Sequence, residues 1–251
     1  MAVHSLLNPL RTTWRFVRTR IHTAAGQIRR YVCLAIADVD RRRFEARGLE
    51  PESSRRQQLL LVAHADDELI FAPRLLTSHR PKGEQLLVVC ATVSSVRRLL
   101  IFRLAGVLHR RTKFICLYCR DSSDGFSLED EIVLFNFLSR REGVFSAIFT
   151  HNPDGDYGHP QHRKIAQIAS SMLPLSQLNF FSDYRPERPS NAGEQMTSQR
   201  PAHRFLMFLY GQTVPKPQRT SFFQHFEFAS GESITATEWF ASRPIGRSNI
   251  G

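Results

Sequence analysis

Two short stretches of the chain combine residue types that suit metal-assisted hydrolysis. The first, "HADDE", follows the apolar run Leu59 to Ala63, so His64, Asp66 and Asp67 lie where a strand ends and a helix begins. Adjacent carboxylates raise each other's pKa unless a cation offsets their charge. Either one aspartate caps the helix, or an imidazole and a carboxylate bind a divalent ion. The capping interpretation leaves the other aspartate and His64 without a role.

The second stretch, residues 151–165, has the sequence "HNPDGDYGHPQHRKI". It follows the strand-like "FSAIFT", and Pro160 opens a predicted helix. His159 and His162 are three residues apart, so both can face one cleft from the start of that helix. A catalytic zinc ion needs a third protein ligand and an open position for water. An HxxH pair alone is weak evidence, but both stretches occupy the same position between a strand and a helix.

The elements that must position these residues alternate along the chain from about residue 57. Apolar runs predict strands, and the segments between them predict helices at about 67–78, 94–110, 127–140 and 160–172. Strands that are apolar on both faces indicate a mostly parallel sheet covered by helices on both sides, a Rossmann-like three-layer αβα fold. Its ligand site is expected where the strands end. The strand-like runs are "QLLLVA", "EQLLVVCATV", "TKFICLY", "FSAIFTH" and "LNFFS".

The motifs resemble those of the PIG-L/LmbE-like zinc-dependent N-acetylglucosaminyl deacetylases. That family has an AHPDDE segment and, about a hundred residues later, a GHPDH segment; this chain has "AHADDE" and "GHPQH". The resemblance spans roughly residues 57–175. Ala65 replaces a proline, which removes no chemical group, whereas Gln161 replaces an aspartate and loses a charge that can orient a neighbour. The chain also has "LIFAPRLL" where many members have a glycine-rich turn.

The resemblance implies a role for five residues of this chain. His64, Asp67 and His162 would hold Zn²⁺. Asp66 would be the general base that takes a proton from water, and His159 would be the acid that stabilises the oxyanion and assists the departing amine.

Other polar residues near these motifs have a structural interpretation that we favour over a functional one. Asp121 and Asp124 could touch sugar hydroxyls, but "SSDG" is typical of a turn. Arg97 and Arg98 could meet an acidic group of a substrate, but a solvated helix face is the favoured interpretation. Asp156 and Tyr157, next to the second motif, could shape the pocket or could simply pack in the loop. The other histidines singled out, His79, His109, His203 and His225, show no partner pattern.

The N-terminal region, residues 1–56, forms a basic arm. Residues 1–57 hold twelve arginines and five acidic residues, a net charge of +7 in a chain of +11. Apolar residues from Leu7 to Val32 recur at steps of three and four, which predicts an amphipathic helix. Its apolar stripe could cover the protein's own core, a twin subunit or an anionic membrane surface, and the composition also suits an organellar transit peptide.

The remaining segments extend one catalytic domain. The core is predicted at 57–182, a polar loop or lid at 183–202 and a C-terminal extension at 203–251, where "HRFLMFLYG" and "SFFQHFEFAS" are further strands or helices. The four cysteines, Cys33, Cys90, Cys116 and Cys119, are too scattered for a disulfide framework. Cys116 and Cys119 form a CxxC within an expected strand, whose alternating faces separate them.

The leading functional hypothesis is a metal-dependent amide hydrolase that removes an N-acetyl group from an amino sugar in a glycolipid, glycan or small glycoconjugate, as in glycan biosynthesis. We expect a cytoplasmic protein, because no apolar run is long enough to span a bilayer, and the arm could hold it at a membrane as a peripheral protein. The alternatives are a basic protein that binds nucleic acid or membrane and an inactive relative that keeps the fold for binding. We expect no nucleic acid partner, because the core contains no nucleic-acid module; the oligomeric state stays open.

Overall fold

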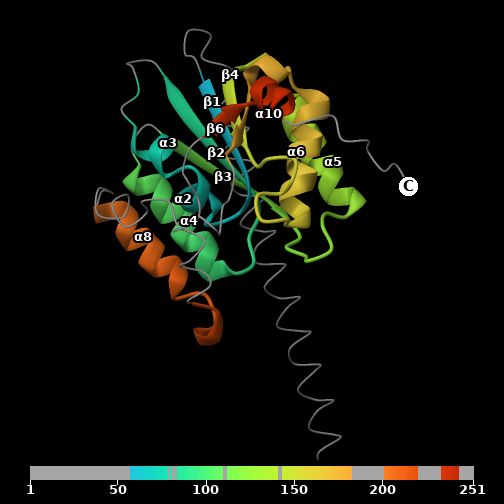
Figure 1. Cartoon of the computed structure of the whole chain (residues 1–251). Helices are drawn as coiled ribbons and strands as arrows, with labels where there is room; N and C mark the ends of the chain where they lie inside the picture. Colours follow the sequence, from blue (N-terminus) through green and yellow to red (C-terminus); the bar gives the residue numbers. More distant parts are fainter. Residues whose placement is uncertain are drawn as a thin grey trace, which may run out of the picture. The chain divides into compact units, whose positions relative to one another are not determined.

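The sheet is the centre of the fold. The computed structural model describes residues 57–78, 80, 84–109, 112–140, 143–182, 201–219 and 233–242, which belong to one compact unit, Leu49–Gly251. Within it six strands pair in the order β3-β2-β1-β4-β5-β6, all parallel except β6 (Figure 1). The strands are β1 (Gln57–His64), β2 (Gln85–Thr92), β3 (Thr112–Cys119), β4 (Phe145–Thr150), β5 (Leu178–Phe181) and β6 (Ser233–Thr235).

Helices cover both faces of this sheet, as the sequence predicts for a three-layer αβα fold. One face packs against α2 (Asp67–Phe71), α3 (Pro73–Thr77), α4 (Val96–Leu108) and α8 (Pro201–Gly211). The other face packs against α5 (Leu128–Ser139), α6 (Pro160–Met172) and α10 (Ala236–Ala241). Two 3-10 turns, η1 (Leu175–Gln177) and η2 (Lys216–Gln218), complete the regular elements that the structure describes.

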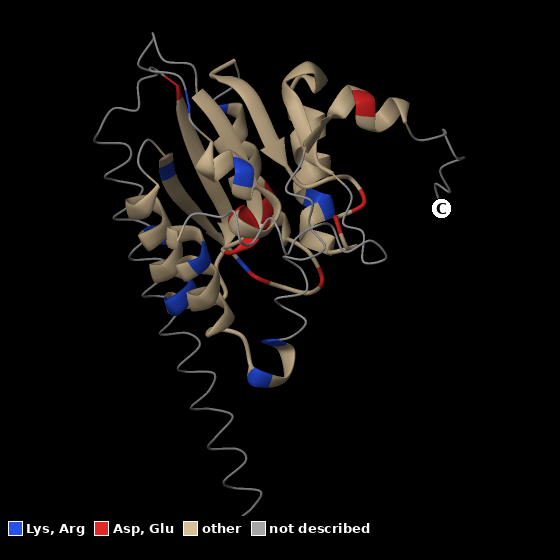
Figure 2. Cartoon of the chain, turned by 60° about the vertical axis from the view of Figure 1, so that its left-hand side comes forward, with Lys and Arg blue, Asp and Glu red and all other residues tan. Residues whose placement is uncertain are grey.

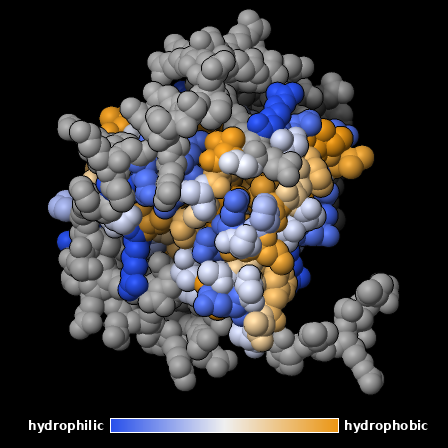
Figure 3. Space-filling model, turned by 90° about the horizontal axis from the view of Figure 1, so that it is seen from above, coloured by the Kyte–Doolittle hydropathy of each residue, from blue (hydrophilic) through white to orange (hydrophobic). Residues whose placement is uncertain are grey.

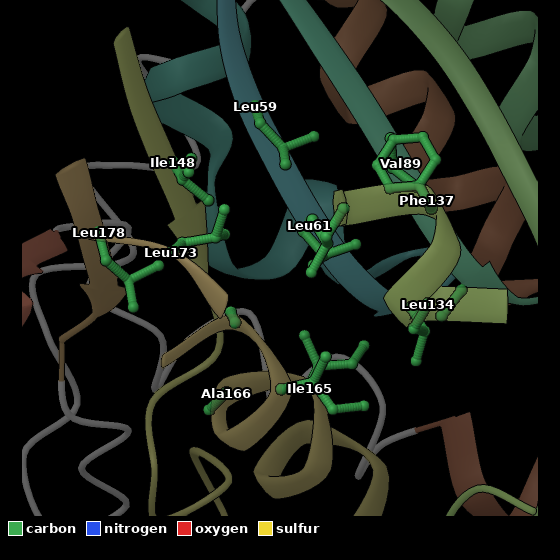
Figure 4. Close-up of a cluster of buried hydrophobic side chains, with 14 of the residues drawn as sticks. Leu59, Leu61, Val89, Leu134, Phe137, Ile148, Ile165, Ala166, Leu173 and Leu178 are labelled. Carbon is green, nitrogen blue, oxygen red and sulfur yellow. The ribbon is translucent and has the colours of Figure 1, made fainter. Parts of the chain in front are cut away.

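The two cores follow from the alternation of side chains along each strand. In β1, Leu60 and Val62 point into the core beneath α4 and α8, whereas Leu59 and Leu61 point into the core beneath α5 and α6. In Figure 4, Leu61 lies between Leu59 and Ile165 of α6 in this second core. Strand β1 therefore has two buried faces, which is why its sequence is uniformly apolar.

Strand β1 is also where the strand order reverses. The chain passes from β1 to β2 and β3 on one side and then returns to place β4 on the other side. Parallel α/β sheets bind ligands at the carboxyl ends of the strands beside such a switch point. His64 ends β1, and His151 directly follows β4, so both predicted motifs arrive at this position.

The predicted helix at 67–78 is two short helices. α2 ends at Phe71, and α3 begins at Pro73. Ala72 between them has φ −126° and ψ 36°, because the residue before a proline is disfavoured in the α conformation. The other three helices lie within two residues of their predicted bounds.

The C-terminal extension adds elements to both sides of the sheet. The segment "HRFLMFLYG" lies in helix α8, which begins at Pro201, two residues before the predicted start of the C-terminal extension at residue 203. β6 adds an antiparallel edge strand, and α10 packs Trp239 against Phe180. The arm at 1–56, the loop at 183–200 and the segment "SFFQHFEFAS" lie outside the described residues.

Three of the four cysteines, Cys90, Cys116 and Cys119, lie in the described residues. Cys116 packs on the α4 side of the sheet and Cys119 on the α5 side, and neither forms a disulfide.

Within the described part of the chain, no helix combines the length and the apolar character needed to cross a membrane.

Candidate metal centre

The five predicted site residues come from the ends of two strands and the starts of the helices that follow them. His64 is the last residue of β1, and Asp66 and Asp67 begin α2. His159 is the N-cap of α6, and His162 lies in its first turn. The structure therefore brings residues separated by almost a hundred positions to the switch point of the sheet, where His64, Asp67, His159 and His162 lie close together and Asp66 adjoins them in the chain.

Three of these side chains converge on one point. The distances are 3.1 Å between His64 Nδ1 and His162 Nε2, 3.2 Å between His64 Nδ1 and Asp67 Oδ2, and 3.3 Å between His162 Nε2 and Asp67 Oδ2. A tetrahedral zinc ion with ligand bonds of about 2.1 Å holds its ligand atoms ~3.4 Å apart. The triangle therefore matches the ligand spacing of a zinc site.

The hydrogen bonds behind this triangle leave lone pairs facing its centre. His64 Nε2 donates to Gln161 Oε1 at 2.8 Å, so in the neutral ring Nδ1 carries the lone pair. Gln161 is oriented for this role, because its Nε2 donates to the carbonyl oxygens of Arg120 and Gly125. Glutamine thus orients His64 by a neutral hydrogen bond where the family pattern has an aspartate.

Asp156 orients the second histidine ligand. Its Oδ2 accepts from His162 Nδ1 at 2.8 Å, which leaves the Nε2 lone pair of His162 facing the triangle. A carboxylate behind a metal-bound histidine fixes the tautomer and raises the basicity of the ring. With Asp67 Oδ2 as the third acceptor, three lone pairs lie within 3.3 Å of one another, an arrangement that a cation stabilises.

Asp156 also contacts His151, to which the sequence assigned no role. The same Oδ2 accepts from His151 Nδ1 at 2.5 Å, and His151 Nε2 accepts the backbone N–H of Ala63 at 2.9 Å. His151 also belongs to an overlapping group, Asp67, His151 and His162, whose ligand atoms lie within 4.8 Å of one another. Because its Nε2 lone pair is already used, His151 supports β1 and Asp156 rather than a metal.

A glycine permits the tight loop that carries Asp156. Gly155 has φ 77°, and a Cβ there would approach the carbonyl oxygen of His159 to 2.7 Å. Asp156 itself has φ 60°, the left-handed region that aspartate tolerates better than most residues. The loop thus brings Asp156 under both histidines.

The two adjacent aspartates differ in their surroundings. Burial raises the pKa of Asp67, but His162 and His64 outweigh burial and hold that pKa well below its usual value. For Asp66, burial dominates over the opposing charge of Arg98 and raises the pKa to about 6. Arg98 Nη1 lies 2.8 Å from Asp66 Oδ2. Asp67 is therefore suited to bind a cation, and Asp66 is suited to exchange a proton near neutral pH.

Asp66 is held in an unusual backbone conformation by residues far along the chain. Its φ is 151°, and its N–H donates to Glu68 Oε2 at 2.9 Å. Glu68 is fully buried, and its Oε1 accepts from the hydroxyl of Tyr210 in α8 at 3.0 Å. Thr213 Oγ1 then accepts from Arg98 Nε at 3.0 Å and donates to the carbonyl of Tyr210 at 2.7 Å. Both the amide and the carboxylate of Asp66 are thereby connected to the end of α8.

His159 lies beside the triangle without belonging to it. A ligand nitrogen of its ring lies within 4.8 Å of those of His64 and His162. Its Nδ1 accepts the backbone N–H of Gln161 at 3.2 Å, so the neutral ring carries its proton on Nε2. Burial, aided by His162 and His64, lowers the pKa of His159 to about 4. His159 is thus a neutral hydrogen-bond donor at physiological pH.

The residues at the rim follow the sequence predictions only in part. Asp124 lies in a turn, as expected, and Asp121 comes within 3.8 Å of His64 Nε2. The ring of Tyr157 lies 5.1 Å from that of His162 and covers one side of the site. Arg98 contradicts its prediction: it is mostly buried and paired with Asp66 rather than lying on a solvated helix face.

Three residues of the site, His151, Glu68 and Tyr210, have no role predicted from the sequence. His151 directly follows β4, the position that corresponds to His64 at the end of β1, and this equivalence could have predicted it. Glu68 completes the "HADDE" stretch, but a strand or helix pattern cannot show that its carboxyl is buried. Tyr210 is separated from Glu68 by 142 residues, and no local pattern connects them.

Similarity to known proteins agrees with this fold. No protein-family model matches the chain. The uncharacterized protein L374 of Acanthamoeba polyphaga mimivirus is 29% identical over 150 residues, a match that covers 53% of this chain and 64% of that protein, slightly less than two thirds of its length. The N,N'-diacetylchitobiose deacetylase from Pyrococcus horikoshii, solved with its inhibitor MPG, matches with a TM-score of 0.53 and 15% identity over 80% of this chain and 90% of its own.

Two more distant structures also match. The conserved protein TT1542 from Thermus thermophilus has a TM-score of 0.46 at 14% identity and covers 66% of this chain and 84% of its own. The 4-carboxy-2-hydroxymuconate hydratase GalB from Pseudomonas putida KT2440 has a TM-score of 0.42 at 16% identity, with coverage of 66% and 89%. The α/β fold that this chain shares with the diacetylchitobiose deacetylase is what the structural similarity establishes.

Proposed function

We propose that this chain is a zinc-dependent hydrolase that removes the N-acetyl group of an amino sugar. The observation that carries the proposal is the triangle of His64 Nδ1, Asp67 Oδ2 and His162 Nε2, with edges of 3.1–3.3 Å and a lone pair of each atom facing inward. The fold shared with a diacetylchitobiose deacetylase and the two motifs support the same reaction.

The chemistry divides between the triangle and the residues beside it. A divalent ion held by His64, Asp67 and His162 would polarise the amide carbonyl and lower the pKa of a water molecule. Asp66 is an ionised carboxylate above about pH 6 and takes the proton of that water. The adjacent aspartates thus have separate tasks.

His159 and Asp66 complete the reaction. The Nε2–H of His159 donates a hydrogen bond to the carbonyl oxygen as negative charge develops on it. Because the pKa of His159 is lowered to about 4, this ring has no second proton to give near pH 7. We assign the return of the proton to Asp66, which protonates the nitrogen as the C–N bond breaks. The products are acetate and a free amine.

Two substitutions separate the metal site from the base. Asp67→Ala removes a ligand, and the purified variant should lose its zinc. Asp66→Asn should retain zinc and lower the rate of acetate release from N,N'-diacetylchitobiose or an N-acetylglucosaminyl lipid by about a thousandfold or more. Asp124→Asn, a carboxylate in the exposed turn of the rim, is the matched control and should behave as the wild type.

Two results would contradict the proposal. Purified protein that binds no stoichiometric divalent metal, or an Asp66→Asn variant with wild-type acetate release, would mean that the chain is not this enzyme. Metal is measured by elemental analysis, and acetate release is measured on the same preparation.

A further inference from the structure

Helices α4 and α8 expose large apolar side chains to solvent. On α4, Leu100 is 60% exposed and Val107 75% exposed. On α8, Phe205 is 51% exposed and Phe208 56% exposed. In each helix the opposite face is buried in the core, so these residues lie on the outward stripe of the helix.

The two outward stripes form one surface. α4 and α8 pack against each other on the same face of the sheet. Arg97 Nη1 donates to the carbonyl of Gln212, and Arg98 Nε donates to Thr213, so the start of α4 is joined to the end of α8. We call this surface, defined by Leu100, Val107, Phe205 and Phe208, the α4/α8 face.

The α4/α8 face is surrounded by positive charge. Residues 93–109 and 201–219 contain no aspartate and no glutamate. Figure 2 shows basic residues and no acidic residues along these two helices and the turn after α8. The basic residues of the two segments are Arg97, Arg98, Arg103, Arg204, Lys216 and Arg219, of which Arg98 is mostly buried and paired with Asp66.

We propose that the α4/α8 face docks on an anionic lipid bilayer. Phenylalanines and aliphatic side chains on one helix face, flanked by arginine and lysine, are the composition that binds at the boundary between headgroups and acyl chains. The charge disfavours two other occupants. A second copy would bring like charges together, and so would the N-terminal arm, whose first 37 residues include no acidic residue.

Exposed apolar residues occur elsewhere on this protein, and there the charge differs. Figure 3 shows hydrophobic residues at several separate places on one side of the molecule. Helix α5 exposes Ile132 at 49% and Phe135 at 43%, but its first turn holds Glu129, Asp130 and Glu131. An acidic helix is repelled by an anionic bilayer, so α5 provides the matched control.

Docking through this face would bring lipids near the metal centre. Helix α4, which carries Leu100 and Val107, begins beside the metal centre, because Arg98 in its first turn contacts Asp66. A bilayer there would suit an amino sugar attached to a lipid. That substrate class rests on the proposed function, whereas the docking surface does not.

The test is co-sedimentation of the full chain with phosphatidylcholine vesicles that contain or lack phosphatidylserine. The wild type should bind only the phosphatidylserine vesicles. Phe205→Ser with Phe208→Ser should weaken that binding by at least about tenfold. Arg204→Gln with Lys216→Gln should weaken it by about fivefold per charge, since one basic residue near an anionic surface contributes about 1 kcal/mol.

A control variant shows whether binding depends on the α4/α8 face. Phe135→Ser on α5 should leave vesicle binding unchanged, and circular dichroism checks that every variant folds. Equal binding of the wild type and the Phe205/Phe208 variant would assign binding to another part of the chain and overturn the proposal. The proposal would also be overturned if the protein bound no vesicles and instead formed a dimer or a nucleic-acid complex that requires Phe205 and Phe208. None of these readouts depends on enzymatic activity.

Discussion

Hydrogen-bond partners determine the role of each polar residue at the candidate metal centre. His64, His151, His159 and His162 lie together, yet their rings serve three different purposes. In His64 and His162 a partner holds the proton on the outer nitrogen and leaves a lone pair for a cation. In His151 a backbone amide uses the lone pair, and in His159 the N-cap bond does so.

Gln161 orients His64 although it lacks the charge of the aspartate in the family pattern. Its Oε1 accepts from His64, and its amide group is itself fixed by two backbone carbonyls. A neutral acceptor therefore fixes the tautomer of His64, although it supplies less basicity to the ring than a carboxylate does.

Asp156→Asn tests the second orienting residue. The amide retains one acceptor for two histidine rings, so His162 loses the carboxylate that fixes its tautomer. We expect zinc affinity to fall about ten- to a hundredfold, measured by competition with a chelator. Asp154→Asn, at an exposed position in the same loop, should leave the affinity unchanged. Equal affinities in the two variants would mean that Asp156 has only a packing role.

At the scale of elements, helix α8 supports the catalytic geometry from outside the motif region. The sequence predicts a strand or helix here and attaches no function to it. Tyr210 nevertheless binds Glu68, which accepts the backbone N–H of Asp66. Thr213 binds Arg98, which pairs with the Asp66 carboxylate. The short α2 provides little stability of its own, so the conformation of Asp66 depends on these contacts.

Tyr210→Phe tests this support. Loss of the hydroxyl leaves the buried Glu68 carboxyl with one fewer partner, which should lower the free energy of unfolding by about 1–3 kcal/mol in urea titrations. We expect kcat to fall several-fold while zinc content stays at the wild-type level. Phe205→Tyr, on the exposed side of the same helix, should change the unfolding free energy by less than about 0.5 kcal/mol. A normal kcat in Tyr210→Phe would mean that α8 stabilises the fold without affecting Asp66.

For the molecule as a whole, buried histidines make stability depend on pH. His203 in α8 is fully buried, and burial together with the nearby charge of His109 lowers its pKa to about 4. The unfolded chain has the ordinary pKa of about 6.5 and therefore takes up a proton first as the pH falls. The stability that His203 contributes in its neutral form is present above pH 6.5 and is lost between that pH and about 4.

His203→Leu tests this dependence. Between pH 7 and pH 5 the wild type should lose about 2 kcal/mol more unfolding free energy than the variant, measured in urea at each pH. Because each protein is compared with itself at the two pH values, any pH-independent effect of the substitution on the free energy of unfolding cancels. Parallel pH curves for the two proteins would show that His203 does not titrate on unfolding in this range.

The sequence determined the order of strands and helices and placed the five predicted site residues at strand ends. It could do so because buried parallel strands have uniformly apolar sequences and because the helices that carry the motifs begin at local capping signals such as His159 and Pro160. The break between α2 and α3 at Ala72 also has a local cause, Pro73. The sequence pattern nevertheless predicted one helix at 67–78, because the apolar residues continue across the break.

Only the tertiary structure decided which atoms meet. The strand order placed β4 beside β1 and so brought His151 and His162 to His64. Tertiary packing also pairs Arg98 with the Asp66 carboxylate, where the sequence predicted a solvated arginine, and brings Tyr210 to Glu68, which accepts the N–H of Asp66. These contacts join residues 32 to 142 positions apart, and their geometry depends on packing across two cores rather than on any local preference of the chain.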